Sequence, residues 1–229
     1  MRNYLRLSLL TTALIFTFSI FTNAQTNINE ILKRMDEHQK ALTSLKANVI
    51  MDKYNAQLDE HDIYEGSAMY VKIKERDANV RIDWVKPQQE SLSVVNKQYV
   101  LFRPRLKQAI VGNTDDAQKK NTQGVDSFSF LKMSKEQLRA NYSVKYMGEE
   151  DIKGGIRTWH LELTPKTAKS YKSVDVWVDG NGMVLQTKVN ETNGDSTTLN
   201  LSGLQKNVTI NVKNEIVIKL PPGTEIIKG

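Results

Sequence analysis

The chain has 229 residues with 32 basic and 26 acidic side chains, a formal net charge of +6 and no cysteine. The charges are interspersed and form none of the runs expected of a nucleic-acid-binding arm, so nucleic acid is not an expected partner. Without cysteine the chain can form no disulfide and can carry no lipid on an N-terminal cysteine.

The first 24 residues have the features of a secretory signal peptide. A short basic start is followed by an apolar run over residues 7–21, and the small residue Ala24 precedes the expected cleavage point. The run is shorter than the roughly 20 apolar residues that cross a membrane as a helix. We expect residues 1–24 to be cleaved, with an uncleaved N-terminal anchor as the alternative. Residues 25–229 are then expected to form a single exported, soluble domain.

An amphipathic helix follows and leads into strands. Apolar residues recur at spacings of three and four over residues 28–45, and Asn27 or Asn29 is suited to cap the helix. Alternating apolar and polar residues then predict strands over residues 47–54 and 63–73.

The region of residues 80–112 predicts three or four short strands in succession. Ile82 and Trp84 alternate with polar residues, as in a half-buried strand. Asn96 and Lys97 then form a tight turn between two further strands. The region therefore predicts part of an antiparallel sheet with one apolar face, and that face carries a tryptophan.

The rest of the chain contains a polar loop, one or two short helices and several hairpins. Residues 128–142 carry the helical signal, with Ser134 as the expected cap. Strong turn sequences at residues 179–182 and 193–194 separate the alternating segments that follow. In all we expect about ten or eleven antiparallel strands with two or three helices.

A sheet of this size has to curl. Eleven strands at about 4.8 Å spacing give a width of roughly 50 Å, and sheets of that width seldom stay flat. The expected helices are too short to fill the concave side. Two arrangements follow: a barrel closed on its own side chains, or a curled sheet around a cavity, which would suit a carrier of an apolar ligand.

The sequence contains little that suggests catalysis. His38, His61 and His160 are far apart and share no metal-ligand spacing, and no serine nucleophile motif is present. Carboxylates cluster at residues 149–151, but a glycine turn follows them, so solvated charge is expected there. We therefore expect no enzymatic activity, no metal and no cofactor.

The order of elements and several local sequences resemble the LolA family, the periplasmic carriers of outer-membrane lipoproteins. The resemblance covers nearly the whole chain after residue 24. It departs from the family at two positions, where Lys97 replaces a turn glycine and Arg103 replaces a tyrosine before Pro104. The matching segments are Gly66–Val71, Arg81–Trp84 with the nearby Pro87, Gln88 and Gln89, Leu92–Phe102, Val174–Val178 with Asp179 and Gly182, and Leu220–Glu225.

This resemblance implies an α+β, mainly β fold: an unclosed antiparallel half-barrel with the N-terminal helix and short helices as a lid over an apolar cavity. It implies a periplasmic carrier that binds the acyl chains of lipoproteins, or another lipid, and shuttles them from the inner to the outer membrane. The implied partners are an inner-membrane ABC-type lipoprotein-releasing complex and an outer-membrane acceptor, with transient membrane contact by a monomer. A lipid- or lipoprotein-sensing regulator of the envelope with the same fold is the alternative function.

Candidate residues follow from the apolar faces and from the resemblance. In the well-studied branch of the family an arginine near the start of the tryptophan-bearing strand holds the lid closed in the empty form, and the resemblance implies Arg76 or Arg81 as the candidates for this role. The methionines available for an adaptable lining are Met51, Met69, Met133 and Met183. The expected cavity lining consists of Ile82, Trp84, Leu92, Val94, Leu101, Phe128, Phe130, Leu131, Trp159, Leu161 and Val176.

Overall fold

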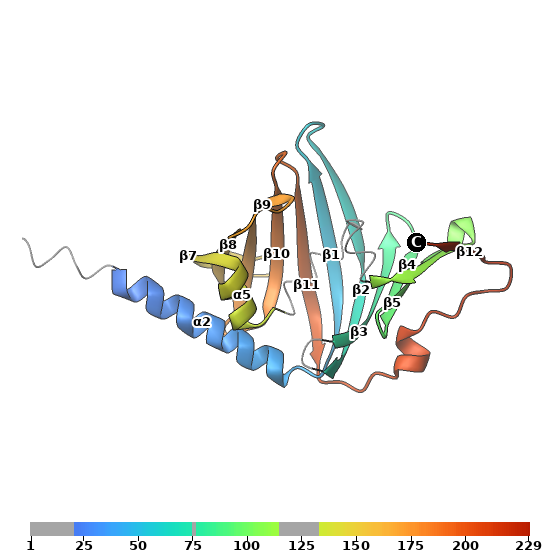
Figure 1. Ribbon diagram of the computed structural model, residues 1–229, viewed down its shortest axis with the longest axis horizontal. Helices are drawn as coiled ribbons and strands as arrows, with labels where there is room; N and C mark the ends of the chain where they lie inside the picture. The colour runs from blue at the N-terminus through green and yellow to red at the C-terminus, as the bar shows by residue number, and fades with distance from the viewer. Residues whose placement is uncertain (1–20, 75–76, 115–132) are drawn as a thin grey trace, which may run out of the picture.

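The computed structural model describes residues 21–74, 77–114 and 133–229, which form one large curled sheet with helices (Figure 1). Within these residues the sheet has twelve strands in the order β12-β6-β5-β4-β3-β2-β1-β11-β10-β9-β8-β7. The strands are β1 (Ser44–Asn55), β2 (Glu60–Lys74), β3 (Asp77–Lys86), β4 (Glu90–Val95), β5 (Gln98–Arg103), β6 (Gln108–Asn113), β7 (Tyr142–Ile152), β8 (Ile156–Pro165), β9 (Tyr171–Asp179), β10 (Val184–Glu191), β11 (Ser196–Lys206) and β12 (Glu225–Lys228).

Neighbouring strands are antiparallel, except that β12 runs parallel to β6. The two ends of the order, β12 and β7, are not paired with each other. The prediction of an unclosed antiparallel half-barrel is therefore confirmed. The helical elements of the described part are α2 (Phe21–Ala41), α5 (Lys135–Asn141), the 3-10 turn η1 (Pro104–Leu106) and the π turn η3 (Val212–Ile216).

Gly66 is one reason why the sheet bends sharply. It lies in β2 where the register with β3 shifts, and a Cβ at this position would lie 2.2 Å from the carbonyl oxygen of Asp83. Only glycine allows two backbones to approach so closely, and a shift of register adds local twist to the strand. Both features favour a curled sheet over a flat one.

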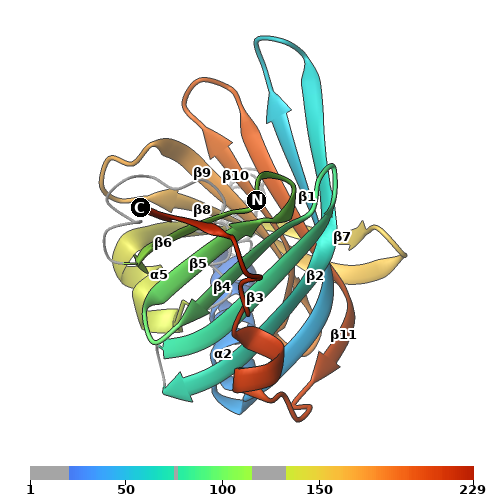
Figure 2. The same cartoon turned by 90° about the vertical axis from the view of Figure 1, so that its right-hand side faces the viewer.

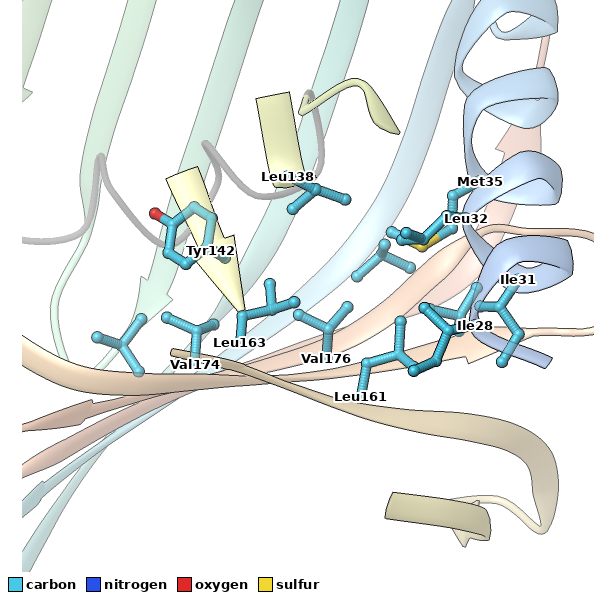
Figure 3. Packing of buried hydrophobic residues seen from close by; sticks show 13 residues of the cluster. Ile28, Ile31, Leu32, Met35, Leu138, Tyr142, Leu161, Leu163, Val174 and Val176 are labelled. Carbon is cyan, nitrogen blue, oxygen red and sulfur yellow. The ribbon is translucent and has the colours of Figure 1, made fainter. Parts of the chain in front are cut away.

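We call the face of the sheet on which α2 and α5 pack the inner face. The helix α2 covers about half of it. Its apolar side chains Ile28, Ile31, Leu32 and Met35 are buried against β8–β10 (Figure 3). They recur at helical spacing, so the amphipathic pattern of the sequence is the pattern that packs on the sheet. The charged side of the helix faces away from the core.

Contacts of Gly182, Arg34 and Lys72 hold α2 in place. A Cβ on Gly182, in the β9–β10 turn, would lie 2.2 Å from the carbonyl oxygen of Arg34, so the helix rests directly on this turn. Arg34 donates from Nη1 to the carbonyl oxygen of Gly180 at 2.9 Å, and its guanidinium lies 5.3 Å from the ring centre of Trp159. Lys72 of β2 donates to two carbonyl oxygens of the last helical turn at 3.1 and 3.2 Å, where the negative end of the helix dipole favours a cation.

The predicted helix caps had different outcomes. In the uncleaved chain the helix α2 begins at Phe21, so Asn27 and Asn29 lie inside it and neither is its N-cap. A cap is needed only where the backbone N–H groups lack partners, and these positions lie beyond that first turn. Ser134 does cap α5: its Oγ accepts from the Gln137 N–H at 3.3 Å, and the Gln137 side chain accepts from the Ser134 N–H at 3.1 Å.

The C-terminal segment, residues 207–224, crosses the outer face of the sheet, opposite to α2 (Figures 1 and 2). Ile216 of this segment is fully buried. Lys46 of β1 pairs with the Glu215 carboxylate at 2.5 Å, and Arg81 of β3 donates to the Glu215 carbonyl oxygen at 3.1 Å. The segment is followed by β12, which extends the sheet beyond β6.

Candidate functional site

Cross-strand pairing makes the inner face one continuous apolar surface. On one side Ile82 lies opposite Leu92, and Leu92 lies opposite Leu101. On the other side Val176 lies opposite Leu161. Directly opposite residues point to the same face of a sheet, and the register through β2, β1, β11 and β10 puts both rows on the inner face.

The half of the inner face formed by β7–β10, which we call the covered half, is filled by helices. Leu161, Leu163, Val174 and Val176 are at most 1% exposed beneath α2 and α5. Figure 3 shows Leu138 of α5 and the residues of α2 pointing toward this row. The covered half is therefore a packed core, and a ligand could occupy it only by displacing a helix.

The half formed by β2–β6, which we call the open half, is different. Ile82 is buried, but its apolar neighbours keep part of their surface accessible. The partly exposed side chains are Tyr64, Ala68, Tyr70, Val80, Trp84, Leu92, Val94, Tyr99, Leu101 and Ile110. An apolar surface that is contiguous and incompletely covered is costly in water, so the open half is the candidate binding surface.

Aromatic side chains give the open half much of its area. The rings of Tyr64 and Trp84 meet edge to face at 5.8 Å between centres. Burial raises the pKa of the Tyr70 hydroxyl. Burial, followed by the negative charges of Asp62 and Glu90, raises the pKa of the Tyr64 hydroxyl. Both phenols are therefore neutral at ordinary pH, and their rings add to the apolar surface.

The structure brings the described members of the predicted lining to the inner face but divides them between its halves. Ile82, Trp84, Leu92, Val94 and Leu101 belong to the open half. Trp159, Leu161 and Val176 lie in the covered half, where Arg34 stands over Trp159. The remaining predicted residues, Phe128, Phe130, Leu131 and Arg76, lie outside the described residues.

Arg81 lies on the outer face. Its Nε donates to the Asp83 carboxylate at 2.8 Å, and its Nη1 donates to the Glu215 carbonyl oxygen. These contacts place Arg81 in the attachment of the C-terminal segment, and its gating of a lid stays a prediction. Met69 lies opposite Arg81 and so also faces outward, which excludes it from the inner lining for which it was considered.

Sequence reasoning missed the aromatic part of the open half. Tyr64 and Tyr70 lie in the same alternating set of β2 as Gly66 and Ala68 and share their face of the sheet, whereas Met69 belongs to the set that faces outward. Both sets of this strand contain apolar residues, so alternation alone could not choose between them. Gly66 was the usable signal, because a glycine inside a strand marks close backbone approach on the concave side.

The described residues contain no group of three His, Asp or Glu placed to hold a metal ion. In the same part of the chain, no helix is both long and apolar enough to cross a membrane.

A protein-family model, described as outer membrane lipoprotein carrier protein LolA, matches residues 69–214. The match begins in β2 and ends in η3, so it includes most of the open half and all of β7–β11. It covers well over half of the chain. No curated protein sequence is similar to the chain at a significant level.

Solved structures share the fold at low sequence identity. An uncharacterized conserved protein from Thermus thermophilus superposes with a TM-score of 0.54 at 11% identity, over 89% of this chain and 99% of the other. MucB superposes with a TM-score of 0.56 at 14% identity; the match covers 87% of this chain and 64% of MucB. LprF from Mycobacterium bovis gives 0.52 at 12% identity, over 82% of this chain and 97% of LprF. At these identities the likeness concerns the fold alone.

Proposed function

Because the chain belongs to the LolA family of outer membrane lipoprotein carriers, we propose that it is a periplasmic carrier whose open half binds acyl chains of lipoproteins or of another lipid. Residues 1–24 direct export and are removed, and residues 25–229 form the carrier domain. The carrier takes its cargo from an inner-membrane ABC-type complex and delivers it to an acceptor at the outer membrane. It works as a monomer and without a cofactor.

The observation that carries this proposal is the contrast between the two halves of one apolar face. The covered half is already filled by its own helices, whereas ten apolar or aromatic side chains of the open half keep accessible surface. The open half therefore has unused capacity to bury an apolar ligand. An alkyl chain has no polar groups to satisfy, so it can lie on such a surface without hydrogen bonds.

The energetics suit a carrier that must also release. Burying about 15 methylenes at about 0.8 kcal/mol each is worth roughly 12 kcal/mol before ordering costs. Several fully buried chains would approach the affinity ceiling near 20 kcal/mol, and the cargo would then leave too slowly. A surface that encloses its ligand incompletely keeps affinity below this ceiling.

Purification from the native periplasm followed by mass spectrometry of the bound molecules tests the proposal. We expect acylated protein or free lipid to accompany the wild-type chain. A Leu92→Asp variant, which places a carboxylate in the open half, should come without it. Wild type that carries no acyl chain and takes up none from detergent-solubilised lipoprotein would contradict the proposal. Acyl-dependent capture of a membrane-bound regulator, in place of delivery to an acceptor, would favour the sensing alternative.

A further inference from the structure

Ten large apolar side chains face solvent in the described part of the chain, and three of the four most exposed lie in one region. The four most exposed are Leu58 at 65%, Ile226 at 62%, Leu106 at 60% and Val85 at 57%. Leu58 lies at the tip of the β1–β2 hairpin. The other three lie at the ends of β3 and β5 and in β12, and we call this region the corner.

Topology holds the corner together. The C-terminal ends of β3 and β5 lie on the same side of the sheet, because β3, β4, β5 and β6 pair antiparallel in sequence order. Leu106 belongs to the turn that joins β5 to β6. The backbone N–H of Glu225, next to Ile226, donates to the carbonyl oxygen of Lys107 at 2.8 Å, so β12 begins beside this turn. In Figure 1 the start of β12 lies far from the tip of the β1–β2 hairpin.

The corner combines its apolar side chains with positive charge. Arg105 and Lys107 flank Leu106 and are exposed, and Lys86 follows Val85. Two acidic groups nearby are offset by ion pairs, Glu90 with Arg103 at 3.1 Å and Glu65 with Lys86 at 2.9 Å. Glu225 accepts from the uncharged Gln108 side chain at 3.0 Å, which does not offset its charge, but Arg105 and Lys107 outnumber it. Arg105 and Lys107 therefore supply positive charge beside an apolar side chain that has no core to enter.

The turn that presents Leu106 is fixed in shape. Lys107 has a left-handed backbone with φ of 51°, and its N–H donates to the Pro104 carbonyl oxygen at 3.1 Å. A preformed turn loses little conformational entropy on binding, so it can present an apolar side chain at low cost. An exposed apolar side chain between cations suits a surface of anionic lipid, where the cations meet head groups and the apolar group enters the acyl boundary.

We propose that the corner docks on membrane surfaces that contain negatively charged lipids. It adjoins the open half, because Trp84, near the end of β3, is paired on the inner face with Glu90 at the start of β4. Docking there turns this end of the apolar surface toward the bilayer. An acyl chain then moves between membrane and protein past Trp84 without crossing much water. This inference extends the proposed function, since it says how the carrier approaches its source or target.

Vesicle flotation with the purified protein tests docking. We expect binding to vesicles of phosphatidylcholine and phosphatidylglycerol at a ratio of about 7:3, little binding to pure phosphatidylcholine, and weakening by salt because exposed charges are screened. The double change Arg105→Gln and Lys107→Gln should lower affinity about thirtyfold. Leu106→Ala should lower it several-fold. Failure of wild type to bind the anionic vesicles would overturn the proposal.

The chain offers two matched controls. Lys153→Gln with Arg157→Gln removes the same charge at the β7–β8 hairpin, and Leu58→Ala removes an equally exposed leucine beside acidic residues. Both should bind vesicles like wild type. If either control loses as much affinity for vesicles as the corner variants do, docking does not depend specifically on the corner. Uptake of a fluorescent fatty acid, measured on the same variants, separates the two proposals. If the protein takes up the fatty acid but does not bind vesicles, only the proposal of docking through the corner is contradicted. If it binds vesicles but takes up no fatty acid, only the proposal of an acyl-chain carrier is contradicted.

Discussion

At Gly182 the absence of one methyl group lets α2 rest on the sheet. The residue has φ of +85°, and a Cβ would meet the Arg34 carbonyl oxygen at 2.2 Å. We expect Gly182→Ala to lower the free energy of unfolding by at least about 2 kcal/mol, because backbone strain and overpacking add. Gly180→Ala, in the same turn with open space around it, should change it by less than about 0.5 kcal/mol. Urea unfolding measures both, and equal effects would disprove the close approach.

Single residues also show where sequence reasoning succeeds and where it stops. The alternation around Ile82 and Trp84 placed both on the apolar face, since polar residues occupy the positions between them. The same reasoning could not place Met69, because both alternating sets of β2 contain apolar residues. The outward face of β3 is partly covered by the C-terminal segment, a contact between positions more than a hundred residues apart. No local pattern reports such a contact.

Among the elements, α2 carries a group whose titration reports on its packing. Burial, followed by the positive charge of Lys206, lowers the pKa of His38 in the last turn, and Asp179 opposes this in part. Between the ordinary value of 6.5 and the lower folded value, the unfolded chain binds more protons. Stability is therefore fully present above this window and falls as the pH drops through it.

We expect His38→Gln to remove this part of the pH dependence. The midpoint of urea unfolding, compared at pH 7.5 and at pH 5.5, should fall less in the variant than in wild type. An unchanged fall would show that His38 is as accessible to protons in the folded chain as in the unfolded one.

The two halves of the inner face should respond differently to the same substitution. Leu161→Ala, in the covered half, should cost about 2–5 kcal/mol of stability because it leaves a cavity in a packed core. Leu101→Ala, in the open half, should cost about 1 kcal/mol and weaken the binding of a fluorescent fatty acid several-fold. Unfolding curves and ligand titrations measure both. If folded Leu161→Ala lost more fatty-acid binding than Leu101→Ala, the ligand would lie in the covered half, contrary to the proposal.

The C-terminal segment depends on one buried side chain. Ile216 is 0% exposed, whereas its neighbour Val217 is 37% exposed. We expect Ile216→Ala to cost about 2–5 kcal/mol and to open residues 207–224 to limited proteolysis, because the apolar contact that fixes the segment is lost. Val217→Ala should leave the digestion pattern unchanged. Equal resistance of both variants would contradict this role of Ile216.

Elements were predicted better than their environment. Strand positions, the hairpin turns, the Ser134 cap and the amphipathic helix follow from local patterns, and the structure contains them. The division into a covered and an open half does not follow, because it depends on where α2 docks. The glycine turn at residues 180–182 contacts Arg34 of the helix, which lies about 150 positions earlier in the sequence. Such docking is set by three-dimensional complementarity, which period and propensity do not encode.

For the whole molecule the central claim is that acyl chains lie on the open half of the inner face. The three tryptophans supply internal probes. Trp84 lies on the open half, whereas Trp177 lies on the outer face, stacked on His160 at 4.5 Å and bonded to the Glu150 carboxylate at 2.9 Å. Bromine on an acyl chain quenches tryptophan fluorescence only at short range, so it reports which face the chain touches.

The measurement is titration with a fatty acid brominated in mid-chain, using two double variants. One keeps only Trp84 (Trp159→Phe and Trp177→Phe), and the other keeps only Trp177 (Trp84→Phe and Trp159→Phe). We predict saturable quenching of Trp84 and unchanged fluorescence of Trp177. Quenching of Trp177 to the same extent, or no quenching of Trp84 at saturating ligand, would contradict the claim.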